Sequence, residues 1–318
     1  MSSHDATSAT PKEPSPISRV LTPIRGQLIV AAGLAAVGAM LTLVPLAAIE
    51  RVARRVLVDT GSATATAGEL GAVVLVAVAS LMLGMALITA GELVAHLADN
   101  RITHHLRLAI MQRLSRVPLG WFSQRASGEV KRTMQDDIGT LHSLTAHFYT
   151  TLGRAVGAVA ISLVYLFAMD WRMALVSLLP FPGFLLVLAR AMKASAANMQ
   201  AIVSGMTRID TATVEFVDGM PVLKAFGSGG QAHGRYREAI NDFAQAFIGF
   251  TRPLVASMAT ANALIAPVTV LGVVLAFGTL FTQLGWIEPI DVLPFALVAP
   301  GLCAPLLLLH YITHDLNS

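Results

Sequence analysis

The sequence predicts an all-α membrane protein with six transmembrane helices and long helical extensions on the cytoplasmic side. Two observations carry this prediction: a composition suited to lipid, and charge-free windows long enough to cross a bilayer. Of the 318 residues, 55% are hydrophobic and 13% are charged, and the mean hydropathy is +0.67. A soluble domain carries about 25% charged residues. The net charge of +3 is scattered between apolar runs, which argues against a nucleic-acid-binding protein.

Residues 1–23 are predicted to form a disordered cytoplasmic tail ahead of a transmembrane domain over residues 24–318. The segment MSSHDATSATPKEPSPIS is rich in Ser, Thr and Pro and has too little apolar surface to fold. The first apolar run begins too late and is too long for the h-region of a secretory signal, so we expect it to remain as the first span.

Six windows free of Asp, Glu, Lys and Arg locate the predicted spans. A helix needs about 20 mostly apolar residues to cross roughly 30 Å of hydrocarbon. The third and fourth windows reach this length by extending into their flanks, and the helix of the fifth is expected to project beyond the bilayer. The windows are Gly26–Ile49, Leu70–Gly91, Ala155–Met169, Met173–Ala189, Pro253–Ile287 and Val292–His314.

The Lys and Arg distribution predicts a multi-pass protein of the cell inner (plasma) membrane with both termini in the cytoplasm. Seven basic residues lie between the second span and Arg154, and seven between spans four and five, whereas the loop Glu288–Asp291 has none. Three arginines do not follow this distribution, because they come after the first span on the outer side: Arg51, Arg54 and Arg55. They either anchor to outer lipid headgroups or form a basic rim that attracts an anionic ligand.

The two long cytoplasmic segments are predicted to be paired helices. Between Asp99 and Arg116, apolar residues recur at spacings of three and four, which marks one helix face. The segment from Lys193 to Ala246 has no long run of helix breakers before Pro221. Two rigid hairpins would then project from the membrane and suit mechanical contact with a soluble partner.

These hairpins carry two motifs by which the chain resembles the transmembrane domains of ABC transporters with the exporter-type (type IV) fold. LRLAIMQRLSRVPLGWFSQRASGEVKRTMQDD, residues 106–137, is similar to the family's first intracellular hairpin. EFVDGMPVLKAFG, residues 215–227, is similar to the stretch after its second coupling helix. The resemblance covers the chain from about Ile24 to its end and implies the six-helix fold of that family.

Three shorter runs, PLGWF, YLFAMDWRMALV and DVLPF, resemble more particularly the larger subunit of the mycobacterial siderophore importer. This resemblance implies uptake of iron-loaded mycobactins, although the flavin-binding reductase domain of that subunit has no counterpart in the sequence. The uncharged centres of the spans favour a lipophilic or amphipathic cargo, which suits a siderophore and equally a drug or lipid. The alternatives are a drug or lipid exporter half and a motor-less membrane scaffold.

The family resemblance also implies partners: membrane lipids, a second transmembrane half in a homo- or heterodimer, and a nucleotide-binding domain that holds ATP and Mg²⁺. No lysine is followed by Ser or Thr as a Walker A loop requires, so we expect no cofactor and no ATPase activity in this chain. The nucleotide-binding domain is expected to be truncated or to lie on another chain. Coupling to it is assigned by resemblance to Ser123, Gln124, Arg125, Gly128 and Glu129 near the first tip, and to Ile209, Asp210, Thr211 and Glu215 near the second.

Glu92, Arg154 and His310 are the candidate residues of a substrate path, because charges inside a membrane are costly and often functional. Glu92 lies about 33 Å into its span at about 1.5 Å per residue, so it could instead reach the inner interface as long side chains do. His310 and His314 share a helix face but have only a terminal aspartate beside them. No metal ligand and no catalytic residue is therefore predicted.

Overall fold

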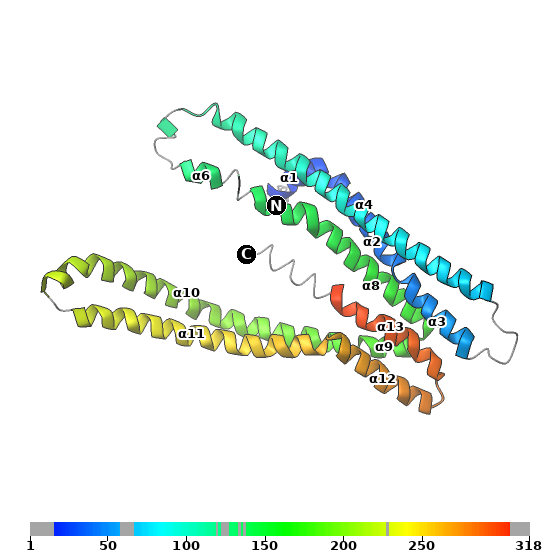
Figure 1. Cartoon of the computed structure of the whole chain (residues 1–318). Coiled ribbons are helices and arrows are strands. Elements are labelled where there is room, and N and C mark those ends of the chain that lie inside the picture. Colours follow the sequence, from blue (N-terminus) through cyan, green and yellow to red (C-terminus); the bar gives the residue numbers. More distant parts are fainter. Residues whose placement is uncertain are drawn as a thin grey trace, which may run out of the picture. The chain divides into compact units, whose positions relative to one another are not determined.

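The computed structural model describes residues 16–57, 67–118, 120–121, 127–132, 135, 138–226 and 229–305. Every regular element among these residues is helical (Figure 1). The chain divides into two compact units, Met1–Met169 together with Gly301–Ser318, and Asp170–Pro300. The predicted all-α class is confirmed.

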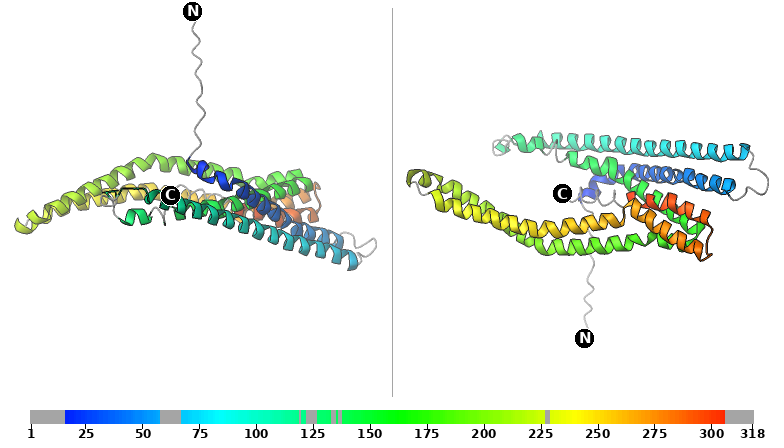
Figure 2. Two further views of the ribbon diagram at one scale, coloured as in Figure 1. Left: turned by 90° about the horizontal axis from the view of Figure 1, so that it is seen from above. Right: turned by 60° about the horizontal axis from the view of Figure 1, so that its bottom comes forward.

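Close helix crossings hold the first unit together. α2 packs against both α4 and α8, and Figure 2 shows α2 and α4 side by side. A Cβ atom on Gly91 would lie 2.8 Å from the Ala31 carbonyl oxygen, so this crossing requires glycine. Small residues at crossings are typical of membrane helices, where packing replaces the hydrophobic effect as the force between helices. The longer helices of this unit are α2 (Arg25–Leu41), α3 (Val44–Leu57), α4 (Ala67–Leu114) and α8 (Tyr149–Met169).

The chain is helical before the predicted domain boundary at residue 24. α1 (Pro16–Leu21) and η1 (Thr22–Ile24) precede α2, and residues 1–15 lie outside the described part of the chain. Leu21 and Ile24 are buried in an apolar core that includes residues of α4. The structure therefore differs from the predicted tail over residues 16–23, because apolar side chains at its end have a partner face that composition alone does not reveal.

The first predicted hairpin is described in part. α4 continues as one helix to Leu114, close to the end predicted from the apolar spacing. Residues 122–126, the predicted tip, lie outside the described residues. The described part of the returning arm includes three short helical segments that lead into α8, namely α6 (Ser127–Arg132), α7 (Ile138–His142) and η3 (Ser143–Phe148).

The second unit begins with a capped helix turn. The Asp170 carboxylate accepts hydrogen bonds from the backbone N–H groups of Arg172 at 2.7 Å and Met173 at 3.0 Å, which is the usual role of aspartate at a helix N-cap. The elements that follow are α9 (Trp171–Leu178), α10 (Pro180–Phe226), α11 (Gly229–Leu264), α12 (Pro267–Gln283), η4 (Pro289–Val292), α13 (Leu293–Val298) and η5 (Ala299–Leu302).

α10 and α11 form a long antiparallel hairpin, the second predicted projection (Figure 1). Arg208 of α10 lies 3.4 Å from Asp242 of α11. The two helices end on either side of residues 227–228, so the predicted tip near Ile209–Val214 lies inside α10 instead. α10 continues through Pro221, so the turn lies closer to the C-terminus than predicted.

The number of spans agrees with the prediction only in part. In the part of the chain that the structure describes, four helices are long and apolar enough to cross a membrane, and a fifth candidate is a pair bent by 47° between Leu264 and Pro267. The apolar helix Pro289–Pro305 is shorter. Since the last predicted window, Val292–His314, is described only as far as Pro305, the count of six stays a prediction.

Candidate functional site

A group of polar side chains lies where α4 faces the segment before α8. We call it the histidine cluster and define it as Glu92, His96, Asp99, His142, Thr145 and His147. Its first half comes from one face of α4. Residues four and seven apart in a helix lie above one another, so Glu92, His96 and Asp99 face the same neighbour.

The other half of the histidine cluster depends on an unusual helix geometry. η3 (Ser143–Phe148) has π-helical hydrogen bonding, which joins residues five apart. His142 and His147 have this separation, and their ring centroids lie 5.3 Å apart. His96 of α4 lies close to both, with centroids 5.7 Å from His142 and 5.1 Å from His147. Short π-helical segments occur often at functional sites.

Asp99 anchors one end of the histidine cluster. It is 4% exposed, and its carboxylate lies 2.7 Å from Nδ1 of His142. The hydroxyl of Thr145, which is fully buried, donates a hydrogen bond to the second carboxylate oxygen. A buried carboxylate is stable only with such partners, so this end of the cluster fixes the position of η3 against α4.

The other end joins two residues of the predicted substrate path. Glu92 Oε1 lies 3.9 Å from Arg154 Nη2, and Glu92 Oε2 lies 3.9 Å from His147 Nδ1. Sequence reasoning selected Glu92 and Arg154 separately, and the structure brings them together. The third candidate, His310, lies outside the described residues.

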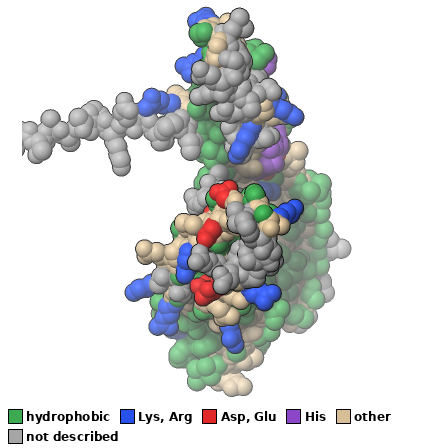
Figure 3. Space-filling view, turned by 90° about the vertical axis from the view of Figure 1, so that its left-hand side faces the viewer, with side chains coloured by type: hydrophobic (Ala, Val, Ile, Leu, Met, Phe, Trp, Pro, Cys, Tyr) green, Lys and Arg blue, Asp and Glu red, His purple; other side chains and the backbone are tan. Residues whose placement is uncertain are grey.

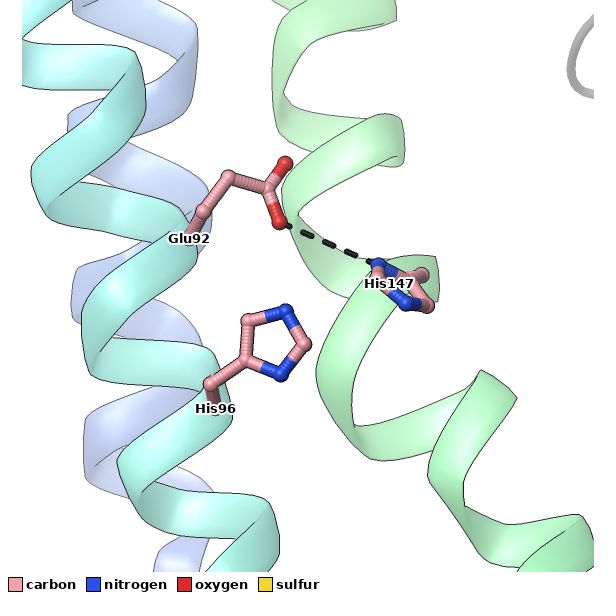
Figure 4. Close-up of side chains that lie close together, drawn as sticks. All are labelled: Glu92, His96 and His147. Carbon is pink, nitrogen blue, oxygen red and sulfur yellow. Dashed lines mark ion pairs between the residues drawn. The ribbon is translucent and has the colours of Figure 1, made fainter.

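Glu92, His96 and His147 could hold a metal ion. Each offers one ligand atom, and these atoms lie within 4.8 Å of one another. In Figure 4 the three side chains point into the space between α4 and η3. Two histidines and a carboxylate form the ligand set of many zinc sites and of non-haem iron sites. The Glu92 side chain is 26% exposed and that of His147 is 52% exposed, so water can complete the coordination.

The sequence patterns predict no metal ligands and do not reveal this group. One half of the histidine cluster could be predicted from the sequence, since Glu92, His96 and Asp99 recur at helical spacing. The other half could not be predicted, because His142 and His147 are five residues apart and would lie on different faces of a regular α-helix. The absence of metal ligands stays a prediction, and Glu92, His96 and His147 are the residues on which it can be tested.

The predicted coupling residues are only partly described, and most of those whose burial is described are exposed. Ser123, Gln124 and Arg125 lie outside the described residues, and Gly128 and Glu129 belong to α6. Ile209 is half-buried in α10, and the nearby Asp210, Thr211 and Glu215 are exposed. Charged side chains of both signs gather at the free end of the α10–α11 hairpin (Figure 3), among them Asp218, Lys224, Arg237 and Glu238.

Comparison with known proteins gives one family match and several relatives. Residues 28–306 match the family described as the ABC transporter transmembrane region. The chain is 33% identical over 294 residues to the mycobactin import ATP-binding/permease protein IrtA of Mycolicibacterium thermoresistibile, which is 92% of this chain and 32% of that protein. The protein of the same name from Mycobacterium tuberculosis is 30% identical over 294 residues, 92% of this chain and 33% of the relative.

A more distant relative is the fatty acid ABC transporter ATP-binding/permease protein of Mycobacterium bovis. It is 26% identical over 144 residues, 45% of this chain and 23% of that protein. The chain spans about a third of the length of the mycobactin import proteins that it matches.

Proposed function

Since this chain belongs to the ABC transporter transmembrane family, we propose that it is the membrane-spanning half of an ATP-driven transporter that takes up a lipophilic iron-siderophore. The observation that supports this cargo is the similarity to mycobactin import proteins over 92% of the chain. Uncharged helix surfaces support it, because an amphipathic ligand can lie against them without desolvating a charge.

The proposed transporter needs two partners. One is a second transmembrane half, of the same or another sequence, which would complete the cavity. The other is a nucleotide-binding domain that binds ATP and Mg²⁺, and the named relatives combine ATP-binding and permease functions in one protein. Coupling to that domain is assigned to Gly128 and Glu129 of α6, to the predicted tip residues 123–125 before them, and to residues 209–211 and 215 of α10.

The orientation proposed from the charge distribution puts both hairpins and both termini in the cytoplasm, in the cell inner (plasma) membrane. The histidine cluster then lies near the middle of α4, on the side from which this helix continues into the cytoplasm. Cysteines placed at Asp210 and at Lys224 test the coupling surface, because residue 224 is near the hairpin's turn and residue 210 is well inside α10. Stronger crosslinking of residue 224 to a co-expressed motor domain would put the contact at the observed turn.

Uptake is the direct test of the proposed function. The chain, co-expressed with a nucleotide-binding domain and a second half, is reconstituted in proteoliposomes with iron-loaded mycobactin carrying radioactive iron. We expect ATP-dependent accumulation that a Walker A lysine substitution in the motor abolishes. A complex that turns over ATP without moving the siderophore would reject this cargo, and failure to assemble with any motor would favour the scaffold alternative.

We also propose that the histidine cluster binds one divalent transition-metal ion through Glu92, His96 and His147. The support is the mutual distance of at most 4.8 Å between their ligand atoms. Arg154 is the present counter-charge of Glu92, at 3.9 Å, and an incoming cation would compete with it for the carboxylate. Equilibrium dialysis of the purified chain against Zn²⁺ should give one tightly held ion per chain. Retention of none after dialysis would reject the site.

A further inference from the structure

A second charged region lies near the start of α4, between α3 and the last turn of α8. It is a cavity of about 870 Å³, which we call the arginine cavity. Arg51, Arg54 and Arg55 line it from α3, and Glu50 and Glu69 line it from α3 and α4. Its volume falls within the range of about 300–1,000 Å³ that is typical of small-molecule sites.

The charges of the arginine cavity do not cancel. Glu50 is 8% exposed and accepts a hydrogen bond from Nε of Arg54 at 2.8 Å, so this pair is satisfied within α3. Arg51, by contrast, has no hydrogen bond or ion pair among the described residues. With three arginines and two glutamates on its lining, the cavity keeps a net positive charge. An arginine without a partner in a cavity favours a carboxylate or phosphate.

A second cavity of about 320 Å³, the apolar cavity, shares part of its wall with the arginine cavity. Arg51 and Glu50 line both, together with Val73 and Met169. The rest of its wall is mostly apolar and includes Val44 and Val76. A ligand that fits both cavities therefore has an acidic head and an apolar tail.

Tyr165 of α8 adds a second, independent sign of a ligand. Its ring lines the apolar cavity, and its hydroxyl oxygen is enclosed without a hydrogen-bond partner in the described part of the chain. Enclosed polar atoms nearly always have a partner in native proteins. Because Tyr165 lines this cavity, a small movement of its ring would let a bound ligand supply the missing partner.

We propose that the arginine cavity and the apolar cavity bind an anionic amphiphile, with the acidic head at Arg51 and the tail between α3, α4 and α8. This goes beyond the proposed transport function and does not depend on it, since neither motor nor siderophore takes part. The ligand can be an anionic phospholipid or a free fatty acid, which share this chemistry. By the proposed orientation, the site opens at the outer leaflet.

The test uses the full chain in neutral detergent, stripped of lipid, and native mass spectrometry to count bound molecules. Phosphatidylglycerol and oleate are titrated separately, with phosphatidylcholine as the neutral comparison. We expect one molecule of an anionic amphiphile to bind tightly, and Arg51→Gln to weaken it about tenfold, as loss of a charge-assisted hydrogen bond does. Arg51→Lys should keep most of the affinity, and Tyr165→Phe should cost a few-fold.

The matched control is Arg107→Gln, an exposed arginine of α4 outside both cavities. It removes the same charge and should leave binding unchanged. If Arg51→Gln lowers the affinity for phosphatidylglycerol alone, the site is assigned to a phospholipid, and if it lowers the affinity for oleate alone, the site is assigned to a fatty acid. Either result would support the proposal. Equal affinities of the Arg51→Gln and Arg107→Gln chains, both folded by circular dichroism, would overturn it.

Discussion

The histidine cluster and the arginine cavity both use α4, but they hold their charges differently. In the cluster, the charged groups come from separate segments of the chain: α4, the α7–η3 segment and α8. Asp99, 4% exposed, is bonded to partners 43 and 46 residues away in sequence. In the cavity, the three cations come from α3 alone, and the buried Glu50 is paired with Arg54 four residues away on the same helix.

This difference separates a tertiary contact from a local one. When a buried carboxylate is bonded to another segment, its loss leaves distant polar groups unsatisfied in a low dielectric. When a carboxylate is paired four residues away on one helix, its loss affects that helix and little else. The cluster should therefore contribute to both ion binding and folding stability, and the cavity chiefly to ligand binding.

The largest expected effect is on metal binding by the histidine cluster. His96→Ala removes one of three ligands, and we expect Zn²⁺ affinity to fall by at least about 100-fold, above the loss typical of groups that only support a ligand. Competition with a coloured chelator measures it. His104→Ala, an exposed histidine two turns further along α4, is the control and should bind as the unchanged chain does. Equal affinities of the two variants would remove the cluster as a metal site.

The next effect concerns stability. Asp99→Asn keeps the shape of the side chain but removes its negative charge, so the buried hydrogen bonds with His142 and Thr145 are no longer charge-assisted. We expect the free energy of unfolding to fall by about 1–3 kcal/mol, measured by denaturant titration in detergent. Glu69→Gln, an exposed carboxylate near the start of α4, should stay within about 0.5 kcal/mol of the unchanged chain. Similar losses in both would show that Asp99 is not a structural anchor.

The smallest effect is expected at the arginine cavity. Glu50→Gln keeps a hydrogen-bond acceptor for Arg54, whose side chain is 38% exposed and can turn to water. The cost to the free energy of unfolding should be about 0.5 kcal/mol, the scale of a pair four residues apart on a helix. The same titration compares it with Asp99→Asn. A cost as large as that of Asp99→Asn would mean that Glu50 also restrains α4 or α8, and the contrast between the two regions would fail.

Much of the fold followed from periodicity and charge. The long extension of α4 was predicted from apolar residues between Asp99 and Arg116, because a helix face is a local property of the sequence. The position of the second hairpin's turn was not predicted, since Pro221 lies within α10 and the turn comes after Phe226. A proline disfavours a helix without always ending it, so its position in the sequence does not fix where the helix ends.

The sequence by itself determined the helical membrane class, the family and the separate interest of Glu92 and Arg154. These depend on composition, motifs and the cost of charge in lipid, all of which are read along the chain. Only the tertiary structure decided that Glu92 lies beside Arg154 and His147, and that Arg51 lines both cavities while Arg54 is paired. The physical reason is that π-helical geometry and helix crossings bring together residues whose spacing in sequence carries no sign of their proximity in space.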